Sequence, residues 1–147
     1  MNITSLTPAD LPLLFPIGHA FTKEVSRAAF NEAAFTKYWA PLLDLKLGEI
    51  YVVRRDTQTV VAVLGATFTP DMFSGVPTAA ETFWYVLPEF RKTGAGLILL
   101  DHFESRAKQL GCEEILMVHF AHLGASLQKL YESRGYSLLE QTFRKES

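Results

Sequence analysis

Two glycines separated by one residue, Gly94 and Gly96, stand between a strand-like segment and a segment with helical spacing. The strand-like segment, Thr82–Leu87, is rich in aromatic and β-branched residues, and Pro88 ends it because proline cannot donate to a sheet ladder. A helix that begins at a glycine turn directs unpaired N–H groups outward, with the positive end of its dipole behind them. The spacing therefore predicts an anion site suited to a phosphate.

An isolated G-x-G motif is weak evidence, since it also occurs in ordinary strand–turn–helix joints. A dinucleotide-binding fingerprint requires a third glycine where Leu99 stands. A Walker loop requires a Gly-Lys-Ser or Gly-Lys-Thr triplet, and none follows Gly96. Arg91 and Lys92 add mobile positive charge at the mouth of the turn, and the ordinary structural joint stays open as an alternative.

The wider pattern is more specific than the glycines alone. The segment Arg91–Gly96 reads R-x-x-G-x-G, and the segment before it, Val86–Phe90, reads V-x-P-E-F. Together they resemble the acetyl-CoA-binding segment of the GNAT superfamily of N-acetyltransferases. The resemblance implies that main-chain amides of the turn hold the pyrophosphate of coenzyme A and that the preceding strand pairs with the pantetheine arm. The cofactor-binding residues that it implies are Trp84, Tyr85, Val86, Arg91, Lys92, Thr93, Gly94, Ala95, Gly96 and Leu97.

A second segment, Leu130–Tyr136, also resembles this superfamily, whose last helix often reads L-Y-e-x-x-G-[FY]. The resemblance implies that Tyr131 lies near the coenzyme A sulfur and returns a proton to the departing thiolate, which a phenol can do because it is protonated at neutral pH. Tyr131 also falls on an apolar stripe, so a role as a core aromatic stays open. Many members carry an asparagine where this chain has Gly124.

Transfer to an amine also benefits from a general base, because an alkylammonium must lose a proton before it attacks. Two residues compete for this role. Glu81 stands at the start of the central strand, where some members place a catalytic glutamate, and His119 stands twelve residues before Tyr131. His119 is slightly favoured because an imidazole suits physiological pH, although ordinary structural roles remain open for both. A metal site is not expected, since the spacing of His119 and His122 sends the two side chains to opposite faces of a strand.

The elements that must position these groups follow the order β-α-α-β-β-β-α-β-α-β. This order contains two strand–helix–strand units and predicts an α/β fold, which the family resemblance refines to a mixed, mostly antiparallel sheet of six to seven strands flanked by four helices. Residues 69–77 are expected to form either a surface loop or a lid over the substrate. The expected segments are strands at Asn2–Leu6, Gly48–Arg54, Val60–Thr69, Thr82–Leu87, Glu114–Phe120 and Tyr136–Phe143, and helices after Thr7, over Asn31–Leu47, from Gly96 to Gly111, and over Gly124–Arg134.

Length and composition set outer limits. The 147 residues predict a single domain over 1–147, and 48% hydrophobic residues indicate a folded globule. A net charge of −2 gives no support for nucleic acid or an anionic membrane as a partner. Cys112 is the only cysteine and cannot form an internal disulfide; with no recognisable leader, a cytoplasmic location is expected. No uncharged apolar run reaches the ~18–20 residues of a membrane span.

The sequence therefore predicts an acetyl-CoA-dependent N-acetyltransferase that transfers the acetyl group directly to a primary amine. The expected partner is a small-molecule or peptide amine, acetyl-CoA is the co-substrate, and a homodimer is left open. The alternative is a non-catalytic module of the same fold that binds acyl-CoA. The identity of the amine is not readable from the sequence.

Overall fold

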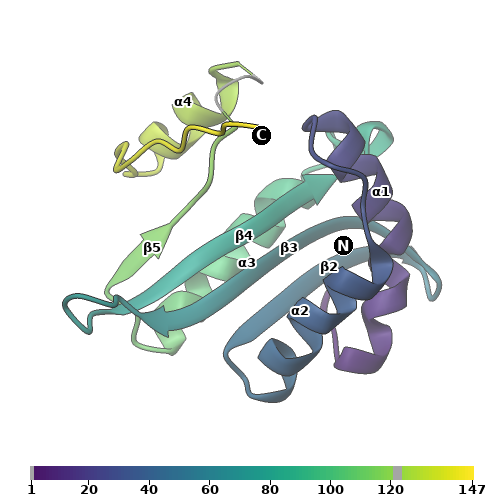
Figure 1. The fold of residues 1–147 in the computed structure, drawn as a ribbon, viewed down its shortest axis with the longest axis horizontal. Helices are drawn as coiled ribbons and strands as arrows, with labels where there is room; N and C mark the ends of the chain where they lie inside the picture. The colour runs from purple at the N-terminus through teal and green to yellow at the C-terminus, as the bar shows by residue number, and fades with distance from the viewer. Residues whose placement is uncertain (1, 121–123) are drawn as a thin grey trace.

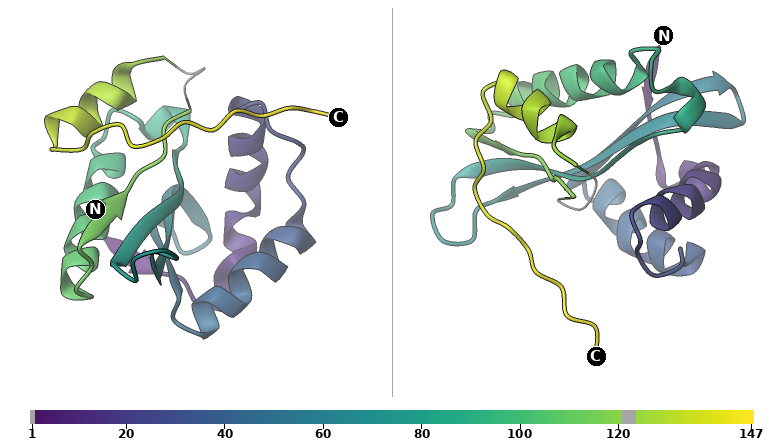
Figure 2. Two further views of the ribbon diagram at one scale, coloured as in Figure 1. Left: turned by 60° about the vertical axis from the view of Figure 1, so that its left-hand side comes forward. Right: turned by 90° about the horizontal axis from the view of Figure 1, so that it is seen from above.

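The computed structural model describes residues 2–120 and 124–147. One five-stranded sheet separates α3 on one face from α1 and α2 on the other, as the two turned views show (Figure 2). No helix of the described residues is long and apolar enough to pass through a lipid bilayer. The elements are β1 (Ile3–Ser5), the 3₁₀ helix η1 (Pro8–Leu14), α1 (Phe15–Glu24), α2 (Glu32–Asp44), β2 (Gly48–Asp56), β3 (Thr59–Pro70), β4 (Pro77–Val86), the 3₁₀ helix η2 (Pro88–Phe90), α3 (Ala95–Gln109), β5 (Glu114–Leu116) and α4 (Ser126–Ser133).

The strands follow the order β1-β2-β3-β4-β5 across the sheet, and Figure 1 shows β2 to β5 of this order. The first four are antiparallel to their neighbours, and β5 runs parallel to β4 after the connection through α3. This arrangement confirms the predicted mixed, mostly antiparallel α/β sheet with four helices. The predicted number of six to seven strands is wrong for the described residues, which form five.

Two predicted strands differ from the structure, and both lie in the C-terminal third of the chain. The strand predicted over Glu114–Phe120 ends at Leu116, because β5 pairs only with Thr78–Ala80 and then diverges from β4. The strand predicted over Tyr136–Phe143 does not form, although the structure describes all of these residues. Its apolar residues Leu138, Leu139 and Phe143 are exposed, and without a neighbouring strand an alternating pattern gains no ladder hydrogen bonds.

The start of the chain follows its proline and cap signals. Thr7 and Asp10 form a reciprocal capping box, and the Pro12-containing segment forms a 3₁₀ helix before the α-helix begins at Phe15. The prolines account for this late start of the α-helix, because a proline inside a helix removes a donor. The Asn31 side chain caps α2 by accepting a hydrogen bond of 2.8 Å from the Ala34 N–H.

Strand β4 begins at Pro77, five residues before the predicted Thr82. The expected loop over 69–77 is therefore shortened to a tight connection between β3 and β4. Asp71 holds it, since its Oδ1 accepts from the N–H groups of Phe73 and Ser74 at 2.9 and 2.8 Å. This connection lies at the end of β4 opposite the glycine turn, so it is not placed to act as a lid over that turn (Figure 1).

A β-bulge at Thr82 changes which face of the sheet the residues of β4 cover. Gly65 and Ala66 of β3 are consecutive, yet they pair with Phe83 and Glu81, so Thr82 is the extra residue. Before the bulge, Ala79 packs in the apolar cluster beneath α3; after it, Phe83 packs beneath α2. An unbroken strand would place two residues four apart on the same face. The bulge, which follows Glu81 directly, therefore changes the face of the sheet to which the subsequent side chains of β4 point.

Candidate active site

The first turn of α3 forms the anion site that the glycines predict. Gly94 caps the helix in the left-handed region, with φ of 86°, a conformation that other residues rarely adopt. Its carbonyl accepts from Ile98 at 3.1 Å, and the Thr93 hydroxyl accepts from Ala95 at 3.4 Å. Within the described residues, no protein acceptor is bonded to the N–H groups of Gly94, Gly96 and Leu97. These donors, at the positive end of the helix, can hold a phosphate. The N–H groups of Gly94, Gly96 and Leu97 are called the anion cradle below.

The two cations beside the turn have different surroundings. Arg91 donates from Nη2 to both carboxylate oxygens of Glu24 at 2.8 Å and from Nε to the Val86 carbonyl at 3.0 Å. Its guanidinium also lies 5.3 Å from the centre of the Tyr85 ring. Arg91 therefore ties the end of α1 to the end of β4. Lys92 is exposed and makes no ion pair with another described residue.

The edge of β4 that faces β5 is open along half its length. Since β5 pairs only with Thr78–Ala80, the segment Glu81–Val86 has no ladder on that side among the described residues. Successive N–H groups of a strand point to opposite edges. The Leu87 N–H donates to Val61 on β3 at 2.9 Å, so the Val86 N–H points to the open edge. An extended amide-bearing ligand can add to such an edge as a further strand would.

Two further observations connect the open edge to the glycine turn. A Cβ on Gly96 would meet Val86 Cγ2 at 3.1 Å and Trp84 Cζ2 at 3.5 Å, so the helix start lies directly against β4. The indole N–H of Trp84 is buried without a partner in the described structure, and such a group is costly unless a ligand or water satisfies it. An anion cradle, an open strand edge and an orphaned donor fit a ligand such as acetyl-CoA, with its pyrophosphate and its amide-containing arm.

Glu81 and Tyr131 are both hydrogen-bonded to the main chain of one residue, Val118, on the segment after β5. The Val118 N–H donates to Glu81 Oε1 at 3.3 Å, and the Tyr131 hydroxyl donates to the Val118 carbonyl at 2.9 Å. Both side chains are only 6% exposed. The ring of Tyr131 also stacks on Trp84, with 6.4 Å between ring centres, which brings it to the cradle side of β4.

Burial decides the ionisation of both groups. It raises the pKa of Glu81 to about 8, and the Val118 N–H offsets only part of that effect. Burial also raises the pKa of Tyr131 well above its ordinary value, and the nearby Glu81 and Tyr136 add to the shift. The phenol is therefore protonated at neutral pH, while the carboxyl exchanges its proton slightly above it. A group that holds its proton and a group that can accept one as pH rises through about 8 are thus bonded to the same residue, Val118.

His119 lies apart from this pair. It is half-buried, and its Nε2 is 2.7 Å from the Gly124 carbonyl, so that nitrogen acts as a donor. The structure thus brings together two of the three predicted catalytic residues, Glu81 and Tyr131, and directs the third toward the start of α4. His122 lies outside the described residues. Among the residues that the structure does describe, no group of three or more His, Cys, Asp or Glu could hold a metal ion.

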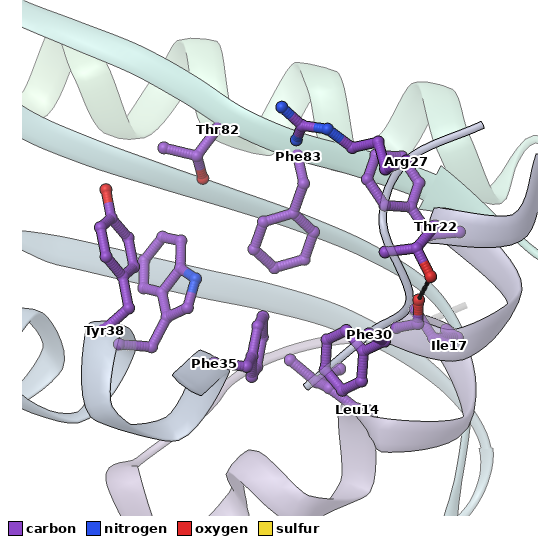
Figure 3. A pocket seen from close by; sticks show the side chains of 12 residues that line it. Leu14, Ile17, Thr22, Arg27, Phe30, Phe35, Tyr38, Thr82 and Phe83 are labelled. Atoms are coloured by element: carbon purple, nitrogen blue, oxygen red, sulfur yellow. Dashed lines mark hydrogen bonds between the residues drawn. The ribbon is translucent and has the colours of Figure 1, made fainter. Parts of the chain in front are cut away.

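A cavity of about 290 Å³ opens on the other face of β4, between α1 and α2 (Figure 3). Nothing in the sequence motifs predicts it. The sequence feature that could have indicated the cavity is the group of aromatic residues in and just before α2. In the folded chain α1 lies beside these residues, and the cavity forms between the two helices. Its lining comprises Leu14, Ile17, Gly18, Phe21, Thr22, Arg27, Phe30, Phe35, Tyr38, Trp39, Thr82 and Phe83.

The cavity and the anion cradle lie on opposite faces of the sheet. Phe83 packs on the cavity side, with its ring 5.5 Å from that of Trp39, whereas the next residue, Trp84, packs in the cluster beneath α3. The open edge of β4 runs between them, next to Glu81 and the bulge. One ligand can therefore approach from each face, and the two can meet at that edge.

Solved structures of similar shape include proteins described as acetyltransferases. A predicted acetyltransferase from Clostridium acetobutylicum, solved with acetyl-CoA, superposes with a TM-score of 0.77 at 17% identity, covering 99% of this chain and 95% of that one. An aminoglycoside antibiotic 6'-N-acetyltransferase from Acinetobacter haemolyticus superposes with a TM-score of 0.73 at 21% identity, covering 100% of this chain and 98% of that one. At such identities the likeness shows the fold.

Sequence comparison supplies the family. One relative, aminoglycoside N(6')-acetyltransferase type 1 of Acinetobacter genomosp. 13, is 36% identical over 62 residues. That match spans 40% of this chain and only 42% of the relative, so it covers less than half of either protein. The model of the acetyltransferase (GNAT) family matches residues 18–136, which include most of the cavity, the cradle and Tyr131. The chain therefore belongs to the acetyltransferase (GNAT) family.

Proposed function

We propose that this protein is an acetyl-CoA-dependent N-acetyltransferase that acetylates a primary amine by direct transfer. The observation that carries the proposal is the meeting of Glu81 and Tyr131 at Val118, beside the open edge of β4 and the amide cradle of α3. A small-molecule amine is the acceptor class supported by the local similarity to an aminoglycoside N-acetyltransferase.

Acetyl-CoA, when bound, supplies an acetyl group activated as a thioester. The main-chain donors of Gly94, Gly96 and Leu97 would hold its pyrophosphate, Trp84 and Tyr85 belong to the strand along which its arm would extend, and the edge of β4 up to Val86 would orient that arm. The Val86 N–H, which points to the open edge, is placed to donate to the oxygen on which negative charge develops. A preorganised main-chain donor needs no reorganisation during the reaction.

The protein's own groups manage two protons. Glu81, in its ionised form, accepts a proton from the acceptor nitrogen, directly or through one water, as the nitrogen–carbon bond forms. Tyr131 holds a proton on its hydroxyl and passes it to the sulfur as the carbon–sulfur bond breaks. Each proton has one donor and one acceptor, and the acyl group passes between substrates without attachment to the protein.

We place Glu81 ahead of His119 as the base because Glu81 and Tyr131 bond the main chain of the same residue, Val118, while the imidazole is bonded to the Gly124 carbonyl. His119 remains the second candidate, since it follows Val118 directly in the chain. Substituting each residue separately decides between them.

Two measurements on the purified chain test the proposal. Thermal unfolding with and without acetyl-CoA reports binding, and release of free thiol in the presence of a panel of primary amines reports turnover. We expect a rise in melting temperature and amine-dependent thiol release. A rise without turnover on any amine supports a non-catalytic acyl-CoA-binding module instead, and no rise at all rejects both functions.

A further inference from the structure

The cavity between α1, α2 and β4 has a composition that restricts the acceptor. On the basis of the proposed function, we propose that the acceptor is an amine with an aromatic body and an anionic group, and that Arg27 is the counter-charge for that group. An aromatic α-amino acid is the simplest molecule of this kind. The same lining opposes a polycationic acceptor such as an aminoglycoside.

The aromatic body follows from the walls of the cavity. Six of its twelve lining residues carry aromatic rings, and Phe83 forms the centre, with its ring 5.9 Å from Phe35 and 5.5 Å from Trp39 in edge-on geometry. Such edge-to-face arrays accept a further ring favourably. An apolar cavity of roughly 150 Å³ is known to bind benzene, so about 290 Å³ suits a phenyl or indole group with a short chain.

The anionic group follows from Arg27, the only charged side chain among the described residues that line the cavity (Figure 3). Arg27 also lines an adjoining open hollow of about 380 Å³, and no described Asp or Glu lines either space. Its guanidinium lies 5.9 Å from the centre of the Phe120 ring, and it makes no ion pair with any carboxylate in the described parts of the chain. The guanidinium N–H groups of Arg27 are thus not paired with a described carboxylate, and they lie beside an aromatic wall. Such an arginine is suited to binding the carboxylate of a ligand.

The neighbouring carboxylates do not neutralise Arg27, because each has another partner. Glu24 accepts from Arg91 and from the Tyr85 hydroxyl, and Glu32 pairs with His19 at 3.0 Å. The threonine hydroxyls of the lining are also engaged: Thr22 donates to the Gly18 carbonyl at 3.1 Å and Thr82 to the Gly65 carbonyl at 2.8 Å. Within residues 2–120 and 124–147, the cavity therefore presents one cation without a carboxylate partner and a wall of apolar rings.

A polycationic acceptor meets the wrong chemistry here. Several ammonium groups brought into a site need nearby carboxylates to replace their lost hydration, and Arg27 adds a like charge instead. The lining of this cavity therefore does not favour an aminoglycoside as the acceptor. The placement suits an aromatic amino acid, because Thr82 and Phe83, which line the cavity, directly follow Glu81 along β4.

Calorimetric titration of the full chain, with saturating coenzyme A as a non-reactive occupant of the cradle, tests the proposal. The four probes are L-phenylalanine, 2-phenylethylamine, L-alanine and kanamycin. We expect L-phenylalanine to bind at least about tenfold more tightly than 2-phenylethylamine, which lacks the carboxylate, and than L-alanine, which lacks the ring. We expect no measurable heat of binding with kanamycin.

The variant Arg27→Met keeps an apolar stem and removes the charge. It should weaken L-phenylalanine binding about tenfold and leave 2-phenylethylamine within about twofold. Arg55→Met is the matched control, because Arg55 is an exposed residue of β2 that pairs with the neighbouring Asp56, and it should change neither affinity. An equal loss for both amines, or an unchanged ratio in Arg27→Met, overturns the role of Arg27.

Tighter binding of kanamycin than of L-phenylalanine, or no binding of any aromatic probe, overturns the acceptor class. Acetyl-CoA-induced thermal stabilisation, recorded on the same protein, keeps this result separate from the proposed function. If stabilisation occurs and aromatic probes fail, the acceptor inference alone is wrong. If stabilisation is absent, the proposed function fails, whatever the probes show.

Discussion

The two faces of β4 present different kinds of group to a ligand. On the α3 face, the cradle consists mainly of backbone: free N–H groups at Gly94, Gly96 and Leu97 and the edge of β4 that carries no ladder among the described residues. On the α1–α2 face, the cavity consists of side chains, six of them aromatic and one of them Arg27. The first surface can bind any ligand with a pyrophosphate and an amide arm, whereas the second depends on which side chains meet.

This difference explains why one face can be predicted and the other cannot. A backbone cradle requires glycines at fixed short spacing, so it leaves a compact motif in the sequence. The cavity is assembled from η1, α1, the connection between α1 and α2, α2 and β4, and its lining residues are separated by up to 69 positions, between Leu14 and Phe83. No local pattern encodes such a surface, and its chemistry becomes visible only when the chain is folded.

The largest expected effect concerns the turn. Gly94→Val places a β-branched side chain at φ of 86° and crowds the free amides, so we expect acetyl-CoA affinity to fall by roughly 100-fold or more, about 2.7 kcal/mol. Isothermal titration of the variant with acetyl-CoA measures this loss directly.

Gly111→Val provides the matched control for backbone strain. Gly111 also has positive φ, 75°, but it lies past the far end of α3, where an added Cβ would meet nothing within 4 Å in the described structure. Both variants should lose similar stability on thermal unfolding, and only Gly94→Val should lose the ligand. Equal affinity in the two variants would show that the turn is not the cradle.

The next effect concerns proton delivery. Tyr131→Phe removes the hydroxyl but keeps the ring on Trp84, so kcat should fall roughly 100-fold while acetyl-CoA binding stays within about twofold. Tyr136→Phe is the control, because its hydroxyl donates to Glu104 at 2.8 Å and its ring lies 5.6 Å from that of Tyr131. This control should lose about 1 kcal/mol of stability and no turnover. Similar kcat values in both variants would remove Tyr131 from the acid role.

The limits of sequence-based prediction follow the same division within the fold. Alternation and turn residues locate β2 and β3 closely, and the glycine motif places the start of α3 within a residue. The extent of β5 depends on how long β4 stays beside it, which no residue of Glu114–Phe120 encodes. Likewise, Glu81 gains its significance from the bulge at Thr82 and from Val118, a contact across 37 positions.

The third effect concerns the base and depends on pH. With the pKa of Glu81 at about 8, the ionised base accumulates as pH rises, so kcat/KM should increase between pH 7 and about 9. Glu81→Gln should lower turnover and abolish this rise of kcat/KM with pH (the alkaline limb of the profile), whereas His119→Ala should retain it. A limb near pH 8 that persists in Glu81→Gln and disappears in His119→Ala would assign the base to His119.

Stability provides an independent check on Glu81. Its pKa in the folded protein lies above that of an unfolded glutamate, so its protonated form favours folding at acid pH and that contribution is lost as pH rises through about 8. Glu81→Gln removes this dependence. Relative to the variant, the wild type should therefore lose stability from pH 5 to pH 9, by an amount on the order of a few kcal/mol. The free energy of unfolding is measured by urea denaturation at each pH for the wild type and for Glu81→Gln. If the two proteins show the same dependence on pH, Glu81 is not buried in its neutral form.

The smallest effect separates the adjacent cations Arg91 and Lys92. Arg91 is held by Glu24 and the Val86 carbonyl, so its charge is directed to α1 rather than to the turn. Arg91→Met should therefore cost under about 1 kcal/mol of stability, since the pair is part-exposed, and should change acetyl-CoA affinity little. Lys92 has no such partner among the described residues, so Lys92→Met should weaken binding by roughly two- to fivefold at low salt and less at high salt, because exposed charges are screened. A larger, salt-dependent loss of acetyl-CoA affinity in Arg91→Met would mean that Arg91 leaves Glu24 to contact the phosphates. The cradle would then consist of backbone donors and one mobile arginine, and the contrast with the side-chain cavity would be less sharp.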